Sequence, residues 1–265
     1  MEPFPDLPQR YRVIFCDLWG CVHDGYRLFP GVVERLLRWK GEGRTVLFLT
    51  NAPRSPGVVG RELVRLGVPA GAFNGVMTAG EAGVAELKGR PVGFVGTAED
   101  RVDALERGLV LIDEGYDELA CAGLTEEKPQ VEDFAAELSD WRSRGIVLHC
   151  LNPDRVVIHG DQRMVCAGAL ADAYEALGGT VHWYGKPYPE IYREAFRMAG
   201  EPHRSEVVAI GDGLATDMLG AARQGIDAIY VASGIHAGEP FPSDFAAKHD
   251  LGGWAPIATV GSIGA

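Results

Sequence analysis

The chain has 265 residues, of which 46% are hydrophobic and 23% charged, the proportions of an ordinary soluble globular protein with one large domain or two modest ones. Its 37 acidic residues outnumber the 25 basic ones and give a formal net charge of −12. This balance argues against nucleic acid as a partner, because binding to a phosphate backbone usually needs a basic surface. It does not exclude a small anionic substrate, since a bound cation can invert the local field.

The sequence predicts a cytoplasmic protein that has no membrane as a partner. The N-terminal stretch MEPFPDLPQRYR lacks the apolar segment of a signal peptide. The chain also lacks a run of about 18 apolar residues, the length that would span a bilayer. Its five cysteines include no CxxC pair and are odd in number, which favours reduced thiols over a framework of disulfides.

Short β-branched segments alternate with helical patterns, which is typical of βαβ units and a parallel sheet. From the N-terminus the pattern predicts, in order, a strand at 11–17, a helix at 30–43, a strand at 45–51 and a helix at 55–67. The alternation returns later with a strand at 180–186, a helix at 189–200, a strand at 206–212, a helix at 215–225 and a strand at 227–234. The tail from about Glu239 is rich in Gly and Pro and carries only a weak pattern.

The middle of the chain has an alternation of its own. Strand-like segments lie at 90–96, 108–113 and 146–152, and helical patterns at 131–145 and 167–179. The simplest interpretation is an α/β fold with one doubly wound parallel sheet built from both ends of the chain and a second α/β domain inserted into it. We expect residues 1–78 and 181–265 to form the core and residues 79–180 to form the inserted domain.

Polar residues that could take part in catalysis or ligand binding lie at the carboxyl ends of four predicted strands. They are Asp17, Thr50 with Asn51, Lys186 and Asp212. Each alone has a structural explanation, such as capping of the following helix. Ligands of open parallel sheets bind beyond the carboxyl ends of the strands, so their joint occurrence predicts a site.

The residue types suggest phosphoryl chemistry with a metal ion. Asp17 and Asp212 offer hard carboxylate oxygens to Mg²⁺, which prefers few carboxylates together with water and a substrate phosphate. Thr50 and the amides around Asn51 offer hydrogen bonds to a phosphoryl group, and Lys186 offers positive charge. Asp217 falls in the first turn of a predicted helix, where it could orient a metal-bound water, hold Lys186 or simply favour the helix dipole.

The segments DLWGCV, LTNAPRS, GKPYPEIY and GDGLATDM, in this order, resemble the four motifs of the haloacid dehalogenase superfamily. The insertion between the second and third motifs resembles the large α/β cap of its class IIA branch, which includes sugar-phosphate and nucleotide phosphatases. MTAGEA and LNPDRV add to the likeness, which covers nearly the whole chain. The resemblance implies a Rossmann-like core, a Mg²⁺ ion, a covalent aspartyl-phosphate and a small phosphorylated metabolite as substrate.

The resemblance also gives each site residue a role. Asp17 matches the nucleophile, and Thr50 matches the hydroxyl that binds the phosphate. Lys186 matches the lysine that steadies both the nucleophile and the phosphoryl group. Asp212 matches a metal ligand and Asp217 the closing acid of the fourth motif. A cap of this kind would close over the substrate, exclude water and set specificity. The resemblance also allows a homodimer, because such caps often mediate pairing in the family.

At Trp19 the sequence departs from the pattern of the family's phosphatases. They carry a second Asp there, which protonates the leaving group and later activates water, whereas Trp has no titratable group. Its backbone carbonyl can still ligate the metal, as any residue's can. General acid–base catalysis typically contributes ~10² to 10⁴-fold, so about 3 to 5 kcal/mol of the barrier lacks an assigned residue.

Three alternatives follow from this departure. A phosphatase could take its acid/base from His23 or Asp24 in the CVHDG turn, from a cap residue or from the substrate. A metal-independent dehalogenase would resemble the site in its aromatic residue, yet GDGLATD keeps both acids of a metal-type motif. A phosphate-ligand-binding protein with vestigial turnover is the third alternative.

Two further features have structural interpretations beside functional ones. Cys21 could be proposed as a thiol nucleophile, but no His is placed to activate it, so a small buried residue is the favoured interpretation. Asn152 and Asp154 in LNPD could face a substrate, although a turn after a strand explains them equally well.

Overall fold

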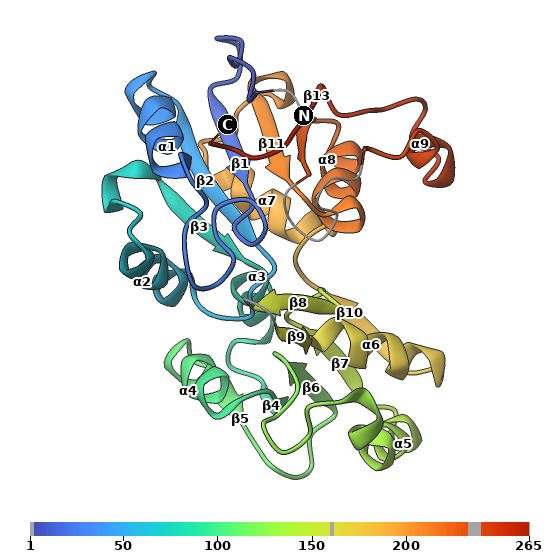
Figure 1. The fold of residues 1–265 in the computed structure, drawn as a ribbon. Helices are drawn as coiled ribbons and strands as arrows, with labels where there is room; N and C mark the ends of the chain where they lie inside the picture. The colour runs from blue at the N-terminus through green and yellow to red at the C-terminus, as the bar shows by residue number, and fades with distance from the viewer. Residues whose placement is uncertain (1–2, 160–161, 233–239, 265) are drawn as a thin grey trace. The chain divides into compact units, whose positions relative to one another are not determined.

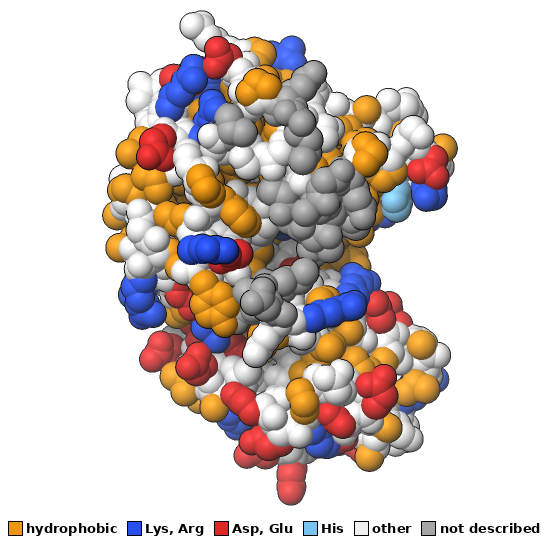
Figure 2. Space-filling view, in the orientation of Figure 1, with side chains coloured by type: hydrophobic (Ala, Val, Ile, Leu, Met, Phe, Trp, Pro, Cys, Tyr) orange, Lys and Arg blue, Asp and Glu red, His pale blue; other side chains and the backbone are white. Residues whose placement is uncertain are grey.

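The computed structural model describes residues 3–159, 162–232 and 240–264, which form two compact units (Figure 1). The first unit comprises Met1–Thr50, Gly60–Met77 and Lys186–Ala265, and the second comprises Asn51–Val59 and Thr78–Gly185. Among the described residues no helix is long and apolar enough to cross a membrane. On the face shown in Figure 2, acidic and basic side chains are interspersed.

The first unit is built on a six-stranded sheet in the order β13-β12-β11-β1-β2-β3. The strands are β1 (Val13–Cys16), β2 (Thr45–Thr50), β3 (Gly75–Thr78), β11 (Val207–Gly211), β12 (Asp227–Val231) and β13 (Ala258–Val260). Pairing is parallel from β13 through to β2. The chain adds β2 and β3 on one side of β1 and then β11, β12 and β13 on the other, so the order reverses between β1 and β11. Such a reversal is the point where doubly wound sheets bind ligands.

Helices of the first unit carry their apolar residues at helical spacing. They are α1 (Val32–Gly41), α2 (Pro56–Leu66, whose first residues group with the second unit), α7 (Pro189–Met198), α8 (Leu219–Gln224) and α9 (Phe245–Lys248). In α7, Pro189 occupies the first turn, where its missing N–H leaves no hydrogen bond unmade. Ile191, Tyr192, Ala195 and Phe196 form its buried face and pack with Phe15 and Leu47 of the central strands.

The second unit contains a five-stranded parallel sheet in the order β10-β7-β6-β4-β5. Its strands are β4 (Pro91–Val95), β5 (Val110–Leu111), β6 (Glu118–Cys121), β7 (Val147–Cys150) and β10 (Thr180–Trp183). An antiparallel hairpin of β8 (Val156–His159) and β9 (Gln162–Val165) is separate from this sheet. The helices are α3 (Ala79–Leu87), α4 (Ala98–Glu106), α5 (Ala135–Arg144) and α6 (Ala167–Ala176).

These sheets confirm the predicted fold class, a Rossmann-like α/β core with parallel strands. The strand at 180–186, however, was expected in the core sheet, and this expectation is wrong. β10 pairs in register with β7, and its Val181 and Trp183 pack on the apolar core of the second unit. The chain returns to the first unit at Lys186, after Gly185 with φ of +93°. The site-bearing Lys186 therefore follows a strand of the other sheet.

The structure also differs from the helix predicted at 215–225. A single π-helical turn covers Leu214–Met218, and α8 begins only at Leu219. Of the predicted strand at 227–234, β12 covers Asp227–Val231, while residues 233 and 234 lie outside the described residues, as does Glu239 at the start of the tail.

Candidate active site

Asp17 and Asp212 lie side by side at the point where the strand order reverses. β1 and β11 are parallel neighbours with Cys16 opposite Ile210, and the backbone N–H of Asp17 donates a 2.8 Å hydrogen bond to the carbonyl of Ile210. Both aspartates follow directly at the carboxyl ends of these strands and are buried. The parallel register thus places two carboxylates at the same edge, as the sequence predicts.

Lys186 joins Asp17 to Asp217. Its Nζ donates to Oδ1 of Asp17 at 2.5 Å and to Oδ1 of Asp217 at 2.8 Å, and all three side chains are buried. Burial alone would lower the pKa of Lys186, but the two carboxylates hold that pKa well above its ordinary value. Burial, together with the negative charge of Asp17, raises the pKa of Asp217 to about 6 despite the opposing effect of Lys186.

The position of Asp217 depends on the backbone around it. Its Oδ2 accepts a 3.1 Å hydrogen bond from the N–H of Gly213, which follows β11. A Cβ on Gly211, the last residue of β11, would lie 2.1 Å from Cγ of Asp217. Only glycine at residue 211 leaves room for this carboxylate against the strand. The packing against Gly211 and the π-helical turn that carries Asp217 together orient Oδ1 of Asp217 toward Nζ of Lys186.

Cys21 is buried, as the favoured interpretation of the sequence predicts, and the structure also places it beside two of the site carboxylates. Its Sγ and one carboxylate oxygen each of Asp17 and Asp212 all lie within 4.8 Å of one another, and all three residues are buried. The turn after β1 brings it there, since the N–H groups of Cys21 and Val22 donate to the carbonyl of Leu18 at 3.3 and 2.7 Å. Burial, with the nearby charges of Asp212 and Asp17, raises the pKa of the Cys21 thiol well above its ordinary value.

The charge of this cluster suits a divalent cation. The cluster contains three buried carboxylates, those of Asp17, Asp212 and Asp217, and one buried ammonium, that of Lys186, which contacts Asp17 and Asp217. The four groups therefore have a formal charge of 1 − 3 = −2. Buried charge is unfavourable unless it is compensated. A cation of charge +2 beside Asp17 and Asp212 would neutralise the cluster, and their oxygens are the ligands that Mg²⁺ prefers.

Thr50 and Asn51, adjacent in the chain, have different surroundings. Thr50 is buried at the end of β2, the strand that pairs with β1 on the side opposite β11. Nδ2 of Asn51 donates a 2.7 Å hydrogen bond to Oδ1 of Asp154 in the second unit, to which Asn51 itself belongs. Asp154 is itself held in place, because its N–H donates a 3.1 Å hydrogen bond to Oδ1 of Asn152. The LNPD segment thus forms a turn that secures Asn51.

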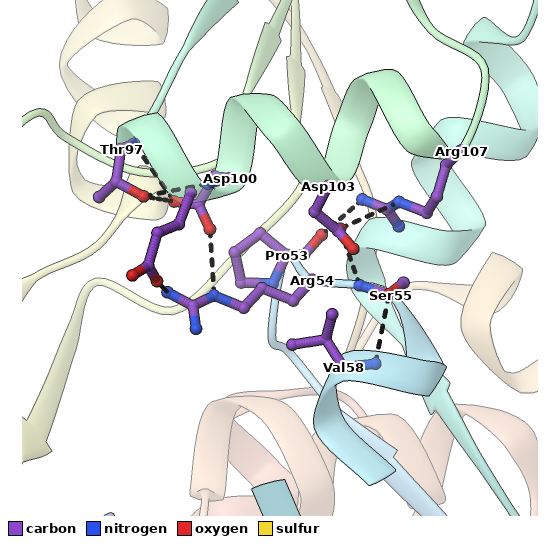
Figure 3. A network of polar contacts seen from close by, with 9 residues as sticks. Pro53, Arg54, Ser55, Val58, Thr97, Asp100, Asp103 and Arg107 are labelled. Atoms are coloured by element: carbon purple, nitrogen blue, oxygen red, sulfur yellow. Dashed lines mark hydrogen bonds and ion pairs between the residues drawn. The ribbon is translucent and has the colours of Figure 1, made fainter. Parts of the chain in front are cut away.

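The segment that follows Asn51 is tied to helix α4 by a network of polar contacts (Figure 3). Nε of Arg54 lies 3.2 Å from Oδ1 of Asp100, and the N–H of Ser55 donates to Oδ2 of Asp103 at 2.9 Å. Nε of Arg107 lies 3.2 Å from the same oxygen of Asp103. These bonds explain why residues 51–59, expected in the core, group with the second unit.

His23 and Asp24, the two acid/base candidates beside Trp19, have different surroundings. The half-buried Trp19 ring lies edge-on to the buried His23 ring, with centroids 5.0 Å apart. Nδ1 of His23 accepts a 3.0 Å hydrogen bond from the N–H of Gly25, so the neutral ring carries its proton on Nε2. Burial opposes ionisation of Asp24, but the hydrogen bonds from the N–H groups of Tyr26 and Arg27, together with the Arg27 side chain, lower its pKa. Asp24 is therefore held as a carboxylate and is a poor proton donor.

Comparisons with known proteins agree with this architecture. A family model for haloacid dehalogenase-like hydrolases matches residues 11–225. The chain is 27% identical over 227 residues to the ribonucleotide monophosphatase NagD of Escherichia coli K12, covering 84% of this chain and 88% of that one. It is 26% identical over 239 residues to the 5′-nucleotidase YutF of Bacillus subtilis, with coverage of 88% and 92%. A haloacid dehalogenase-like hydrolase from Brucella suis 1330 aligns with a TM-score of 0.81 at 35% identity, covering 86% of this chain and 91% of that chain.

Fold and site together define a hydrolytic enzyme of the α/β class, with carboxylates gathered where the strand order of a parallel sheet reverses. The chain belongs to the haloacid dehalogenase-like hydrolase family.

Proposed function

We propose that the protein is a Mg²⁺-dependent phosphatase that acts on a small phosphorylated metabolite through a covalent phosphate on Asp17. The observation that carries this proposal is the position of Asp17, buried between the ammonium of Lys186 and the carboxylate of Asp212. The hydrogen bond from Lys186 stabilises the negative charge of Asp17 and fixes the direction of its carboxylate, which a nucleophile requires.

The reaction has two steps at phosphorus. A carboxylate oxygen of Asp17 forms a bond to phosphorus while the bond from phosphorus to the leaving oxygen breaks. Water then attacks the phosphorus of the aspartyl-phosphate, releasing inorganic phosphate and regenerating Asp17. Lys186 offsets negative charge on Asp17 and the phosphoryl group, and the hydroxyl of Thr50 donates to a phosphoryl oxygen. A bound Mg²⁺ would add charge neutralisation during the transfer.

The cation would be held by Asp17, Asp212 and the backbone carbonyl of Trp19. Asp217, a further candidate ligand, already accepts hydrogen bonds from Lys186 and from the N–H of Gly213. We therefore assign Asp217 as a positioning residue that directs Lys186. With Asn51 engaged by Asp154, we assign its phosphate contact to the backbone rather than to the side-chain amide.

Proton transfer to the leaving group is the step in which this chain departs from the usual arrangement. Trp19 stands where a second Asp would act as the general acid. His23, whose ring contacts Trp19 and which titrates near neutrality in water, is the residue to which we assign this role. A substrate whose leaving group is a weak base would need little such help.

The relatives' names point to the substrate class. NagD and YutF are named for phosphatase activity on nucleotides, and nucleoside monophosphates are therefore the first substrates to test. In this proposal the second unit acts as a cap, and its side chains determine which phosphate monoester is accepted.

The test measures phosphate release from p-nitrophenyl phosphate and from a panel of nucleoside and sugar monophosphates, with and without Mg²⁺. We expect Mg²⁺-dependent turnover that falls by roughly 10⁴-fold or more in Asp17→Asn, in line with loss of a nucleophile. Asp24→Asn is the matched control, because it changes a nearby carboxylate whose hydrogen bonds, within the described residues, are to its own turn. Undiminished turnover in Asp17→Asn would contradict the mechanism.

The same panel separates the alternatives. Saturable Mg²⁺-dependent phosphate binding without turnover on any substrate would favour a phosphate-ligand-binding protein. Release of halide from a haloacid in the absence of metal would favour a dehalogenase.

A further inference from the structure

The thiol of Cys21 differs from the other four thiols of the chain. Cys16, Cys121, Cys150 and Cys166 each direct Sγ at a backbone carbonyl, at distances of 3.2 to 3.9 Å. Cys21 is fully buried, yet its Sγ makes no hydrogen bond to any part of the chain that the structure describes. It lies instead within 4.8 Å of carboxylate oxygens of Asp17 and Asp212.

These three side chains form a mixed donor set for a cation. Carboxylate oxygens suit hard ions such as Mg²⁺, whereas sulfur donors select softer ions such as Zn²⁺. Zn²⁺ binds sulfur at about 2.3 Å and carboxylate oxygen at about 2.0–2.2 Å. With the donor atoms already within 4.8 Å of one another, small side-chain movements suffice for one ion to contact all three.

We propose that Asp17, Cys21 and Asp212 form a mixed oxygen–sulfur site for a thiophilic divalent cation, Zn²⁺ or Cd²⁺, which displaces Mg²⁺ and arrests the enzyme. Binding releases the thiol proton to water and forms a bond from Sγ to the cation. The displacement of Mg²⁺ rests on the proposed function, whereas the binding of the thiophilic ion rests only on the donor set.

The geometry around Cys21 supports preorganised binding. Hydrogen bonds from the N–H groups of residues 21 and 22 to the carbonyl of Leu18 fix the turn that carries the thiol. The cluster described above has an excess of negative charge, since its three carboxylates outnumber its single ammonium, that of Lys186. A divalent cation therefore enters a site that already favours it electrostatically.

Titration of the full-length protein with Cd²⁺ tests the site directly, because cadmium–thiolate coordination produces an ultraviolet charge-transfer band. We expect a saturable band at one equivalent in the wild-type protein, reversed by excess Mg²⁺. Cys21→Ser should abolish the band. It should also weaken Cd²⁺ binding by at least about 10-fold, since loss of even an outer-shell partner typically costs about 10- to 100-fold in metal affinity.

Two further variants secure the assignment. Cys166→Ser, which removes a buried thiol of the second unit, is the matched control and should keep the full band. Asp212→Asn keeps the Cys21 thiol but removes one carboxylate, and it should also weaken Cd²⁺ binding. This variant keeps the proposal testable if Cys21→Ser fails to fold.

The outcomes separate this inference from the proposed function. No band in the wild-type protein, an undiminished band in Cys21→Ser, or an unchanged Cd²⁺ affinity in Asp212→Asn would overturn the site even if Mg²⁺-dependent phosphatase activity is present. A band that depends on Cys21 and Asp212, in a protein without phosphatase activity, would support the cation site and contradict the proposed function. A band that excess Mg²⁺ does not reverse would overturn the proposed competition.

Discussion

Nζ of Lys186 lies 2.5 Å from Oδ1 of Asp17, and both groups are buried. The two residues are separated by 169 positions in the chain and follow strands of different sheets. The pair nonetheless lies within one compact unit, because the chain re-enters that unit at Lys186. Their contact fixes the direction of the proposed nucleophile and supplies positive charge where the phosphoryl group would bind.

Removal of the Lys186 ammonium should destabilise the fold and slow the reaction. Lys186→Met leaves Asp17 and Asp217 as neighbouring buried carboxylates, and loss of one partner of a buried ion pair typically costs ~3–5 kcal/mol. Adding Asp217→Asn removes one of these charges and should restore part of the free energy of unfolding. Denaturant unfolding of the wild type, both single variants and the double variant measures the coupling, and strictly additive effects would contradict the buried network.

A carboxylate at residue 19 should increase the phosphatase rate. Trp19→Asp adds a carboxyl group at the family's usual position to the acid assigned to His23. General acid catalysis is typically worth ~10² to 10⁴-fold, which sets the upper limit of the gain, and the gain should be largest for alkyl phosphates, whose leaving groups need a proton. With p-nitrophenyl phosphate the gain should be small. Trp19→Phe serves as the control for loss of the indole. Equal rates for Trp19→Asp and the wild type on alkyl phosphates would contradict the predicted gain and would show that His23 already supplies the proton without limiting the rate.

The second unit contains a histidine that should make stability depend on pH. Burial lowers the pKa of His149 from 6.5 to about 4. The stacked ring of His182 also lowers this pKa, whereas the nearby Glu118 raises it. The unfolded chain takes up this proton near pH 6.5 and the folded chain only near pH 4. Folding stability should therefore fall as the pH drops from 6.5 toward 4, and this contribution should be constant above 6.5.

Thermal unfolding between pH 4 and 7.5 checks this dependence. His149→Phe should unfold with a smaller loss of stability across the window, because it has no proton to bind. His203→Gln, at an exposed position in the first unit, should keep the wild-type slope. A slope in His149→Phe equal to that of the wild type would show that His149 is not the group responsible.

The network in Figure 3 predicts unequal effects for two acids of α4. Asp103 is buried and accepts from the N–H of Ser55 while pairing with Arg107, so Asp103→Ala should destabilise the protein by ~1–3 kcal/mol. Glu99 pairs with Arg54 at the exposed surface, and Glu99→Ala should change stability by less than about 0.5 kcal/mol. Denaturant unfolding distinguishes the two, and equal effects would contradict the role assigned to Asp103.

The sequence predicts the parts of the site that follow from strand ends. Asp17 and Asp212 each follow an apolar strand and Thr50 ends one, and parallel neighbours bring such ends together without further information. The place of Lys186 could not be derived in this way, because β10 belongs to the second sheet, a pairing that the local pattern does not encode. The position of Cys21 depends on a tight turn, which periodicity does not predict.

Side-chain partners were the least predictable feature. Asn51 carries an amide suited to a phosphate, yet its Nδ2 donates to Asp154, which lies 103 residues away in the chain. Asp24 has the chemistry of a general acid, but its own turn binds it as a carboxylate. Both outcomes depend on three-dimensional neighbours, whereas the residue types alone allow either role.

The most direct measurement of the central claim is chemical trapping of the phosphorylated enzyme. The protein is mixed with Mg²⁺ and substrate, quenched in acid during turnover and reduced with borohydride, which converts an aspartyl-phosphate to homoserine. Mass spectrometry of the peptide that contains residue 17 then locates the modification. We predict homoserine at residue 17, formed only when substrate is present. Modification at a different residue, or an unmodified Asp17 in enzyme that is turning over substrate, would contradict the nucleophilic role of Asp17.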